Sequence, residues 1–354
     1  MGAEPEAWCG RAGMAAESVP GVRRVVYPIP AGRWPERSIS SVRPAELAAK
    51  GRNAEMTLVR TYDSATAQSA ARYVLQIFTY PAQIWRNRYM VYNFLRRDIM
   101  GRFHGSVLGW YWLLMQPLVQ FALYFFVFGI LFGDPRRAIA ASEHFALYLF
   151  SGVIAFYALI ESTTQCCSIV VDNGNLVKKV AFPSEVLPVH VAITSAVLYL
   201  VGASVLVVIG LLLGAIRPGL LILALPLVLA VQVVFTLGIG LLLASVNVFL
   251  RDTTQIWRIV TMAWMFLTPV FWPPATMLGK FGGSPLVPGL LFGLNPAYPL
   301  LQAHRIALGV ADPEGVPLQG FWMHLGTAAS WAAFFLLIGY VTFASRKHKF
   351  ADIV

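Results

Sequence analysis

One carboxylate lies well inside an otherwise apolar stretch of this chain, which makes it the first candidate for chemistry. Glu161 falls within residues 145–168, a run long enough to cross a bilayer. A charged side chain at membrane depth is costly and usually faces protein or water. Glu161 is therefore a candidate for lining a solvated path or holding a gate. The alternative is a carboxylate near the end of the span, hydrogen-bonded to Ser162, Thr163 or Thr164.

The motifs of common catalytic sites are missing from the sequence. It contains no glycine-rich Walker sequence, no HExxH and no GxSxG. The vicinal cysteines Cys166 and Cys167 have no His or carboxylate at metal-ligand spacing, and together with Cys9 they predict no disulfide framework. We therefore expect no catalytic residue, no metal site and no cofactor in this chain.

The composition is that of a membrane protein. Of the 354 residues, 57% are hydrophobic and 12% are charged, whereas a soluble domain has about 25% charged residues. The net charge of +10 would also suit a nucleic-acid partner. Here the basic residues flank apolar runs, which favours a role in membrane topology and no nucleic acid partner.

Six apolar segments are candidates to cross a membrane as helices, each needing roughly 20 residues. The sequence thus predicts an all-α integral membrane protein with six transmembrane helices. An even number of spans places both termini on one side, and the basic N-terminal region assigns that side to the cytoplasm. The predicted spans are 107–132, 145–168, 189–214, 219–246, a short span from about 259, and 321–344.

Four regions follow from this pattern. Residues 1–70 are rich in Ala, Arg, Ser, Pro and Gly without a sustained apolar period, so we expect a disordered N-terminal extension. Residues 71–106 form a cytoplasmic or interfacial helical segment. Residues 107–345 form the six-helix transmembrane domain, and residues 346–354 form a cytoplasmic tail.

The helical segment before the first span is amphipathic. Trp85, Tyr89 and Tyr92 share one helical stripe, whereas Arg86 and Arg97 lie on another face. This pattern predicts a helix that lies in the membrane plane. The alternative is a soluble helix packed on a partner protein.

Prolines interrupt the sequence after the fifth span. Pro269, Pro273 and Pro274, followed by the apolar region 284–300, predict an outer re-entrant region that dips back into the membrane. Broken helices at membrane depth are tolerated where protein or water covers the backbone. The alternative is a plain extracellular loop.

Four motifs, in order, carry a family resemblance. The first is LRRDIMGRFHGSVLGWYWLLMQPL, which begins at Leu95; the others are Asn175–Pro188, Asn247–Trp272, and Asn295-Pro296 ahead of a segment with Arg305. Together they resemble the membrane (permease) subunits of bacterial polysaccharide ATP-binding-cassette exporters of the ABC-2 family, which export O-antigen, capsule and teichoic-acid chains. The N-terminal extension departs from the usual compact form of that family.

The resemblance implies a set of partners. Such a subunit is a homodimer in the bacterial plasma (inner) membrane and binds two copies of a cytoplasmic ABC ATPase. ATP and Mg would be bound by that partner subunit, and no cofactor by this chain. The substrate would be a lipid-linked polysaccharide, surrounded by membrane lipids.

Force from the ATPase must enter this chain through short polar elements. The loop 173–185 is too short for a domain and too polar for lipid, and Phe182-Pro183 would form a rigid apolar knob in it. The alternative is an ordinary stop-transfer loop whose lysines only set topology. The interfacial helix around residues 92–103 is a second candidate contact. The candidates for ATPase coupling are Arg97, Asp98 and Arg102 on that helix, and Asn175, Lys178, Lys179, Phe182, Pro183 and Glu185 on the loop.

Aromatic side chains on the first and fifth spans are candidates for the substrate path. Aromatic rings stack on the C–H faces of sugars and would let a chain slide without tight binding. Interfacial aromatic belts are the alternative, because Trp and Tyr also gather at membrane surfaces. The candidates, together with Glu161, are Trp110, Tyr111, Trp112, Tyr124, Phe125, Phe128, Trp264, Phe266 and Trp272.

Three other functions stay open at this point. An ABC-2 exporter of a small lipid or drug would have a small closed cavity in place of a channel. An integral membrane enzyme acting on polyprenyl-linked lipids would need clustered acidic or His residues at one membrane face, and the sequence shows no such cluster. A scaffold subunit would lack a path altogether.

Overall fold

The computed structural model describes residues 22–23, 62–63, 70–102, 105, 108–131, 139–178, 183–216, 219–275, 289–313 and 316–354. It divides into two units, Met1–Ser69 and Ala70–Val354. In the first unit, β1 (Val22–Arg23) pairs antiparallel with β2 (Tyr62–Asp63). Apart from these two strands and Ala70, residues 1–70, which the sequence predicts to be disordered, lie outside the described residues.

The second unit is helical, and four of its helical stretches are long and apolar enough to cross a membrane. They are His144–Asp172, Val186–Leu212, Leu220–Phe249 and Phe321–Ile353. These stretches match the second, third, fourth and last predicted spans. The chain is therefore a helical integral membrane protein.

The long helices themselves are α5 (Ile139–Asp172), α7 (Val186–Leu212), α8 (Leu225–Phe249) and α13 (Phe321–Arg346). Neither α7 nor α8 contains an Asp, Glu, Lys or Arg residue. Inside lipid the backbone must satisfy its own hydrogen bonds, so apolar runs of this length fold as helices. A 3-10 turn, η5 (Leu220–Ala224), leads into α8.

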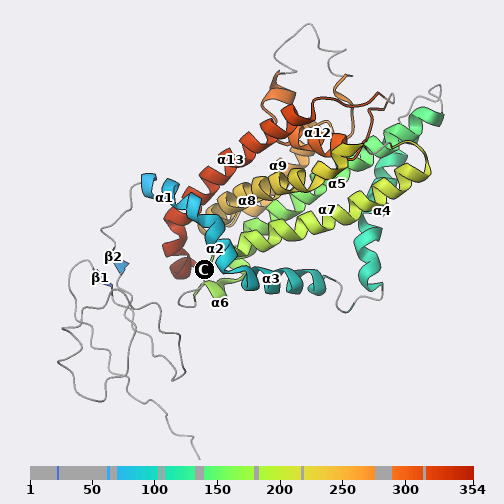
Figure 1. The fold of residues 1–354 in the computed structure, drawn as a ribbon. Coiled ribbons are helices and arrows are strands. Elements are labelled where there is room, and N and C mark those ends of the chain that lie inside the picture. Colours follow the sequence, from blue (N-terminus) through green and yellow to red (C-terminus); the bar gives the residue numbers. More distant parts are fainter. Residues whose placement is uncertain are drawn as a thin grey trace, which may run out of the picture. The chain divides into compact units, whose positions relative to one another are not determined.

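Helix α5 is the central element of this unit. Its most apolar window is 72% buried, compared with 28–39% for the other three membrane stretches. It packs against both α7 and α8, and the four long helices run side by side in Figure 1. The carboxylate of Glu161 therefore lies on the helix with the most protein around it.

Helices α8 and α13 pack backbone to backbone. A Cβ atom on Gly339 would lie 2.0 Å from the carbonyl oxygen of Gly238, and one on Gly238 would lie 2.4 Å from the backbone nitrogen of Leu336. Phe235 and Phe335 make an edge-to-face contact at 5.4 Å beside this crossing. Small residues at a membrane helix interface allow this approach and the dispersion contacts that come with it.

Two shorter helices occupy the places of the first and fifth predicted spans. Helix α4 (Trp112–Tyr124) follows the 3-10 turn η3 (Gly109–Tyr111), contains Pro117, and continues as the π-helical segment η4 (Phe125–Leu131). Helix α9 spans Thr253–Leu267. Whether these two cross a membrane stays a prediction.

The predicted amphipathic segment is a chain of short helices rather than one. It comprises α1 (Ala70–Gln76), η2 (Ile77–Thr79), α2 (Tyr80–Arg86) and α3 (Arg88–Gly101). The break lies at Asn87, whose ψ of 16° departs from helical geometry while its side-chain amide donates to the Gln83 carbonyl. Helix α3 lies across one end of the long helices and packs on α7 (Figure 1); we call this the α3 end.

Residues 346–354, predicted as a tail, fold back on the α3 end. The 3-10 turn η7 (Lys347–Lys349) and helix α14 (Phe350–Ile353) follow α13 directly. Phe350 is fully buried, with its ring 5.1 Å from Phe343. The last residue, Val354, lies against Gly174 of the short helix α6 (Gly174–Val177).

The opposite end, which we call the α12 end, is held by a buried arginine. Arg305 lies on α12 (Ala297–Ala307), which follows the π-helical segment η6 (Gly289–Gly293). Its guanidinium donates to the carbonyl oxygens of Pro269 at 2.8 Å, Val270 at 3.2 Å and Tyr148 at 3.3 Å. It also lies 3.6 Å from the centre of the Tyr148 ring. One side chain thus joins α12 to α5 and to the segment after α9.

Candidate functional site

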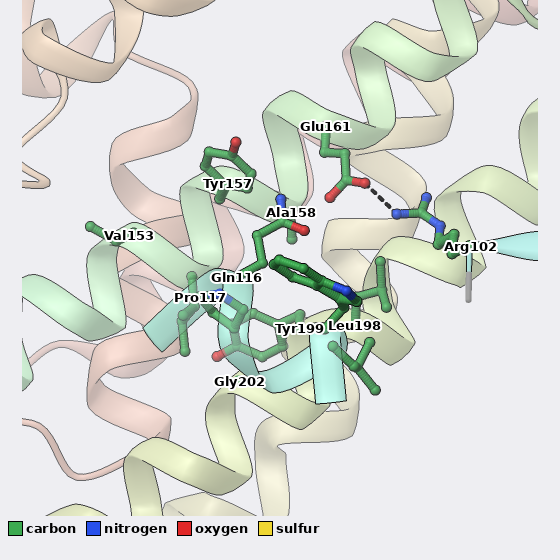
Figure 2. Close-up of a pocket in the computed structure, with 13 residues that line it drawn as sticks. Arg102, Gln116, Pro117, Val153, Tyr157, Ala158, Glu161, Leu198, Tyr199 and Gly202 are labelled. Atoms are coloured by element: carbon green, nitrogen blue, oxygen red, sulfur yellow. Dashed lines mark hydrogen bonds and ion pairs between the residues drawn. The ribbon is translucent and has the colours of Figure 1, made fainter. Parts of the chain in front are cut away.

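A cavity of about 460 Å³ lies between α4, α5 and α7. Figure 2 shows its lining side chains and the ion pair at one end. Apolar side chains form most of its wall, and a smaller number of polar groups line the rest. The lining residues are Arg102, Trp112, Leu113, Gln116, Pro117, Val153, Ile154, Tyr157, Ala158, Glu161, Leu198, Tyr199 and Gly202.

The charged end of the cavity is an ion pair between two segments far apart in sequence. Arg102 Nη1 lies 2.5 Å from Glu161 Oε1. Arg102 also donates to Gln165 Oε1 at 3.1 Å and lies 3.7 Å from Asp98 Oδ1. Burial lowers the pKa of Arg102, but the carboxylates of Glu161 and Asp98 outweigh burial and raise it overall. The guanidinium is therefore charged and shared by two carboxylates.

The sequence left open that Glu161 is hydrogen-bonded to Ser162, Thr163 or Thr164. The structure does not show that arrangement. The hydroxyl of Ser162 donates to the Ala158 carbonyl, and that of Thr163 donates to the Leu159 carbonyl. Hydroxyls within a helix often bond the carbonyl four residues earlier. Glu161 instead pairs with Arg102, which the sequence placed among the coupling candidates.

Three polar lining residues, Gln116, Tyr157 and Tyr199, were missed by the sequence reasoning. Gln116 lies four residues after Trp112, and Tyr157 lies four residues before Glu161, so each pair shares one helix face. That spacing was the available signal. Tyr199 on α7 had no such signal, because its place in the wall depends on how α7 packs against α5.

The other path candidates whose side chains are described do not line this cavity. Tyr111 is exposed, and Phe266 is half exposed. Trp264 donates from its indole nitrogen to Asn295 Oδ1 at 2.9 Å, and Trp272 donates to the Phe266 carbonyl at 3.0 Å. The indole rings of Trp264 and Trp272 therefore help to hold the region between α9 and α12 in place. The side chains of four further candidates lie outside the described part of the structure: Trp110, Tyr124, Phe125 and Phe128.

The coupling candidates lie at the α3 end where they are described. Asn175 and Lys178 are exposed at α6. Glu185 is buried, and Lys347 Nζ lies 2.5 Å from its Oε1. The hydroxyl of Tyr80 donates to the Glu185 carbonyl at 3.1 Å. The end of the loop is thereby joined to the N-terminal helices and to the C-terminal turn.

The remaining coupling candidates differ in exposure. Arg97 is exposed on α3, Asp98 is half-buried beside Arg102, and Pro183 is half-buried. Lys179 and Phe182 lie outside the described residues. The sequence placed Asp98 and Arg102 on the interfacial helix as a second contact for the ATPase, whereas in the structure Arg102 lines the cavity and pairs with Glu161 and Asp98.

A family model for ABC-2 type transporters matches residues 90–284, which is more than half of the chain. The chain belongs to the ABC-2 type transporter family. The matched region runs from α3 through α9 and includes Arg102, Glu161 and Glu185. Both the cavity and the loop at the α3 end are thus parts of an ABC-2 transporter membrane region.

Relatives extend the likeness over most of the chain. It is 26% identical to the "O-antigen export system permease protein RfbA" of Myxococcus xanthus, over 77% of this chain and 98% of that protein. It is 25% identical to a protein of the same name from Klebsiella pneumoniae, over 73% of this chain and 92% of the relative. A second such Klebsiella pneumoniae protein is 23% identical over 73% of the chain.

The Arg102–Glu161 pair in this ABC-2 protein makes a prediction about stability. We expect Arg102→Met and Glu161→Gln each to lower the free energy of unfolding, and the double variant to lower it by less than the sum. Both side chains are partly solvated, so we expect a coupling energy of about 0.5–1 kcal/mol. Unfolding in mixed micelles, run as a double-mutant cycle, measures it. Additive losses would show that the pair contributes no stability.

Proposed function

We propose that this chain is the transmembrane permease subunit of an ABC exporter that carries a lipid-linked polysaccharide from the cytoplasm across the bacterial plasma membrane. The observation that carries the proposal is the match to relatives named as O-antigen export permeases. Those matches span 73–77% of this chain and 92–98% of the relatives. The likeness thus extends through nearly all of each relative rather than one shared segment.

The proposed topology has six spans, with both termini in the cytoplasm. Helix α4 and segment η4 together run from Trp112 to Leu131, long enough to cross a bilayer at 1.5 Å per residue. Helix α9 is shorter, and the outer re-entrant region around α12 would complete the crossing beside it. The bonds of Arg305 to backbone carbonyls support this, because non-helical backbone at membrane depth needs protein partners.

The proposed interfacial segment is α1 to α3. Phe78, Trp85, Tyr89 and Tyr92 are exposed there, with 59–79% of their surface accessible. Exposed aromatic rings beside arginines suit the headgroup layer of a membrane. A partner protein seated on the same face is the alternative already open from the sequence.

Two copies of the chain would bind two copies of an ABC ATPase, which would bind ATP and Mg. In this proposal the ATPase docks at the α3 end, on the exposed residues of α6 and the adjoining loop. The ion pair of Glu185 with Lys347 and the Tyr80 hydrogen bond would pass its movement to α13 and α1–α2. The chain itself would carry out transport and no hydrolysis.

A second candidate is an ABC-2 exporter of a small lipid or drug. The cavity of about 460 Å³ favours it, because that size is typical of small-molecule sites. The membrane-enzyme alternative gains no support from the described residues, since none of them form a group of three or more His, Cys, Asp or Glu fit to hold a metal.

Deletion of the gene in its host tests the proposal. We expect loss of polysaccharide from the cell surface and accumulation of its lipid-linked form inside, with both reversed by the wild-type gene. Lys178→Glu, which reverses an exposed charge at the proposed docking surface, should restore export poorly and co-purify less ATPase. Gln319→Glu, which adds one negative charge at an exposed position of the α12 end, is the control and should behave as wild type. Normal surface polysaccharide in the deletion strain would refute the proposal.

A further inference from the structure

Residues 347–354, which we call the tail segment, are anchored to the α3 end by one aromatic side chain. The ring of Phe350 is fully buried, 5.1 Å from Phe343 on α13 and 6.3 Å from Phe249 at the end of α8. Both contacts are edge-to-face, and such contacts fix the orientation of a ring as well as burying it. The direction in which α14 leaves α13 is therefore set by packing.

The tail segment contacts both ends of the loop between α5 and α7. Lys347 Nζ lies 2.5 Å from Oε1 of the buried Glu185, the residue that precedes α7. At the other end of the segment, Val354 lies against Gly174, the first residue of α6 (Figure 1). The segment thus bridges the two ends of a loop that is far from it in sequence.

The contact at Gly174 leaves no room for another atom. A Cβ atom on Gly174 would overlap Cγ1 of Val354, whereas Cβ of Val354 would lie 3.6 Å from it. Gly174 does not have a positive φ, so a side chain at this position would not strain the backbone. An added methyl group would act on Val354 alone.

Helix α6 depends on its neighbours because it is only four residues long. Its backbone bonds include one from the Lys178 amide to the Gly174 carbonyl at 3.0 Å, and an isolated helix of this length is not stable in water. The turn packs on the end of α5 and on α14. Without α14, the turn that exposes Asn175 and Lys178 would be supported on one side only.

We propose that the tail segment is a brace that holds α6 in the position that the ATPase binds. The docking surface is then built from two separate parts of the chain. The inference rests on the proposed function and adds to it a requirement for residues that the loop itself does not contain. Lys347, Phe350 and Val354 are positioning residues in this role, because they act through the loop and α6.

Hydrogen–deuterium exchange of the full-length protein in lipid nanodiscs tests the brace without any ATPase. Deletion of residues 347–354 should make the amides of α6 exchange about tenfold faster, because the turn opens more often. The amides of α8 and α13 at their glycine crossing should keep their protection, which shows that the deletion variant is folded. Unchanged exchange in α6 of a variant with that protection would overturn the proposal.

A size exchange at the Gly174 contact tests the brace in the complete chain. Gly174→Ala should displace Val354, speed exchange in α6, and weaken binding of the purified ATPase about tenfold in its Kd. Val354→Ala removes the overlapping Cγ1 atom, so adding it to Gly174→Ala should restore both exchange and affinity. Gly326→Ala adds the same methyl group where nothing lies within 4 Å, and it should behave as wild type.

Two results of the size exchange would overturn the proposal. One is equal ATPase affinity of the Gly174→Ala and Gly326→Ala variants, which would show that the docking surface does not depend on the contact with Val354. The other is a defect in Gly174→Ala that Val354→Ala does not relieve. That result would place the added methyl group against the ATPase itself rather than against the tail segment.

Failure of this inference is distinguishable from failure of the proposed function. The gene-deletion assay measures export without reference to residues 347–354. Normal export and ATPase binding by the wild type, together with full ATPase affinity of Gly174→Ala, would remove only the brace. A wild-type chain that neither exports polysaccharide nor binds an ATPase would remove the proposed function, and the ATPase part of this inference with it.

Discussion

Replacing Arg305 with methionine is expected to cost more stability than any other single change of a polar side chain considered for this protein. The guanidinium donates to three buried backbone carbonyls and to Ser151 Oγ, and it stacks on the Tyr148 ring. Methionine has a similar length but no donor, so those acceptors would lose their partner. We expect a loss of about 3–5 kcal/mol in the free energy of unfolding.

Two further variants sharpen the Arg305 prediction. Arg305→Lys keeps a positive charge but loses the planar fork, so its stability should lie between that of Arg305→Met and wild type. Arg251→Met changes an exposed arginine and should stay within about 0.5 kcal/mol of wild type. Unfolding of the purified protein in mixed micelles measures all three. Equal stability of Arg305→Met and Arg251→Met would contradict the structural role assigned to Arg305.

The second large effect is expected at the crossing of α8 and α13. Gly339→Ala adds a Cβ atom 2.0 Å from the backbone carbonyl oxygen of Gly238. A backbone atom cannot rotate away as a side chain does, so the two helices must separate and lose their contacts. We expect a loss of at least about 2 kcal/mol, from the usual cost of overpacking.

The same helix offers a matched control for Gly339. A Cβ atom on Gly326 would meet nothing within 4 Å, so Gly326→Ala should be neutral or stabilising by up to about 1 kcal/mol through helix propensity. Thermal unfolding of both variants in the same detergent compares them directly. If Gly339→Ala were as stable as Gly326→Ala, the close crossing of α8 and α13 would be wrong.

The sequence predicted the membrane stretches best where apolar residues run without interruption. The stretches containing α7 and α8 were expected within a few residues, because α7 and α8 contain no charged residue. The N-terminal helical segment was predicted as one pattern, but it breaks at Asn87. Periodicity does not reveal such a break, because the apolar stripe continues across it while the backbone turns.

The candidate site was predicted in its parts but not in its arrangement. Glu161 and Trp112 were both expected to face a path, and Arg102 was expected to face the ATPase. The structure joins Arg102 to Glu161 across 59 positions of sequence. A pairing of that separation depends on where the end of α3 lies relative to α5, which local patterns do not encode. The i, i+4 partners Gln116 and Tyr157 could have been found from spacing alone.

Two closely packed regions of the helical unit are separate from the cavity. The Gly238–Gly339 crossing fixes α8 against α13, and Arg305 fixes α12 against α5. The cavity lies instead between α4, α5 and α7, and its charged end is a partly solvated ion pair. In the proposed exporter, an opening motion would involve α4 and α3 rather than the α8–α13 pair.

Transport in a reconstituted system would show whether this chain carries polysaccharide across a membrane. The purified chain and its ATPase would be placed in liposomes that contain fluorescent lipid-linked glycan, and a lectin would report glycan exposed on the far side of the membrane. We expect ATP to drive exposure of the glycan, and removal of either protein to abolish it. ATP hydrolysis by a stable complex without any glycan appearing on the far side would contradict the assignment of this chain as a polysaccharide permease.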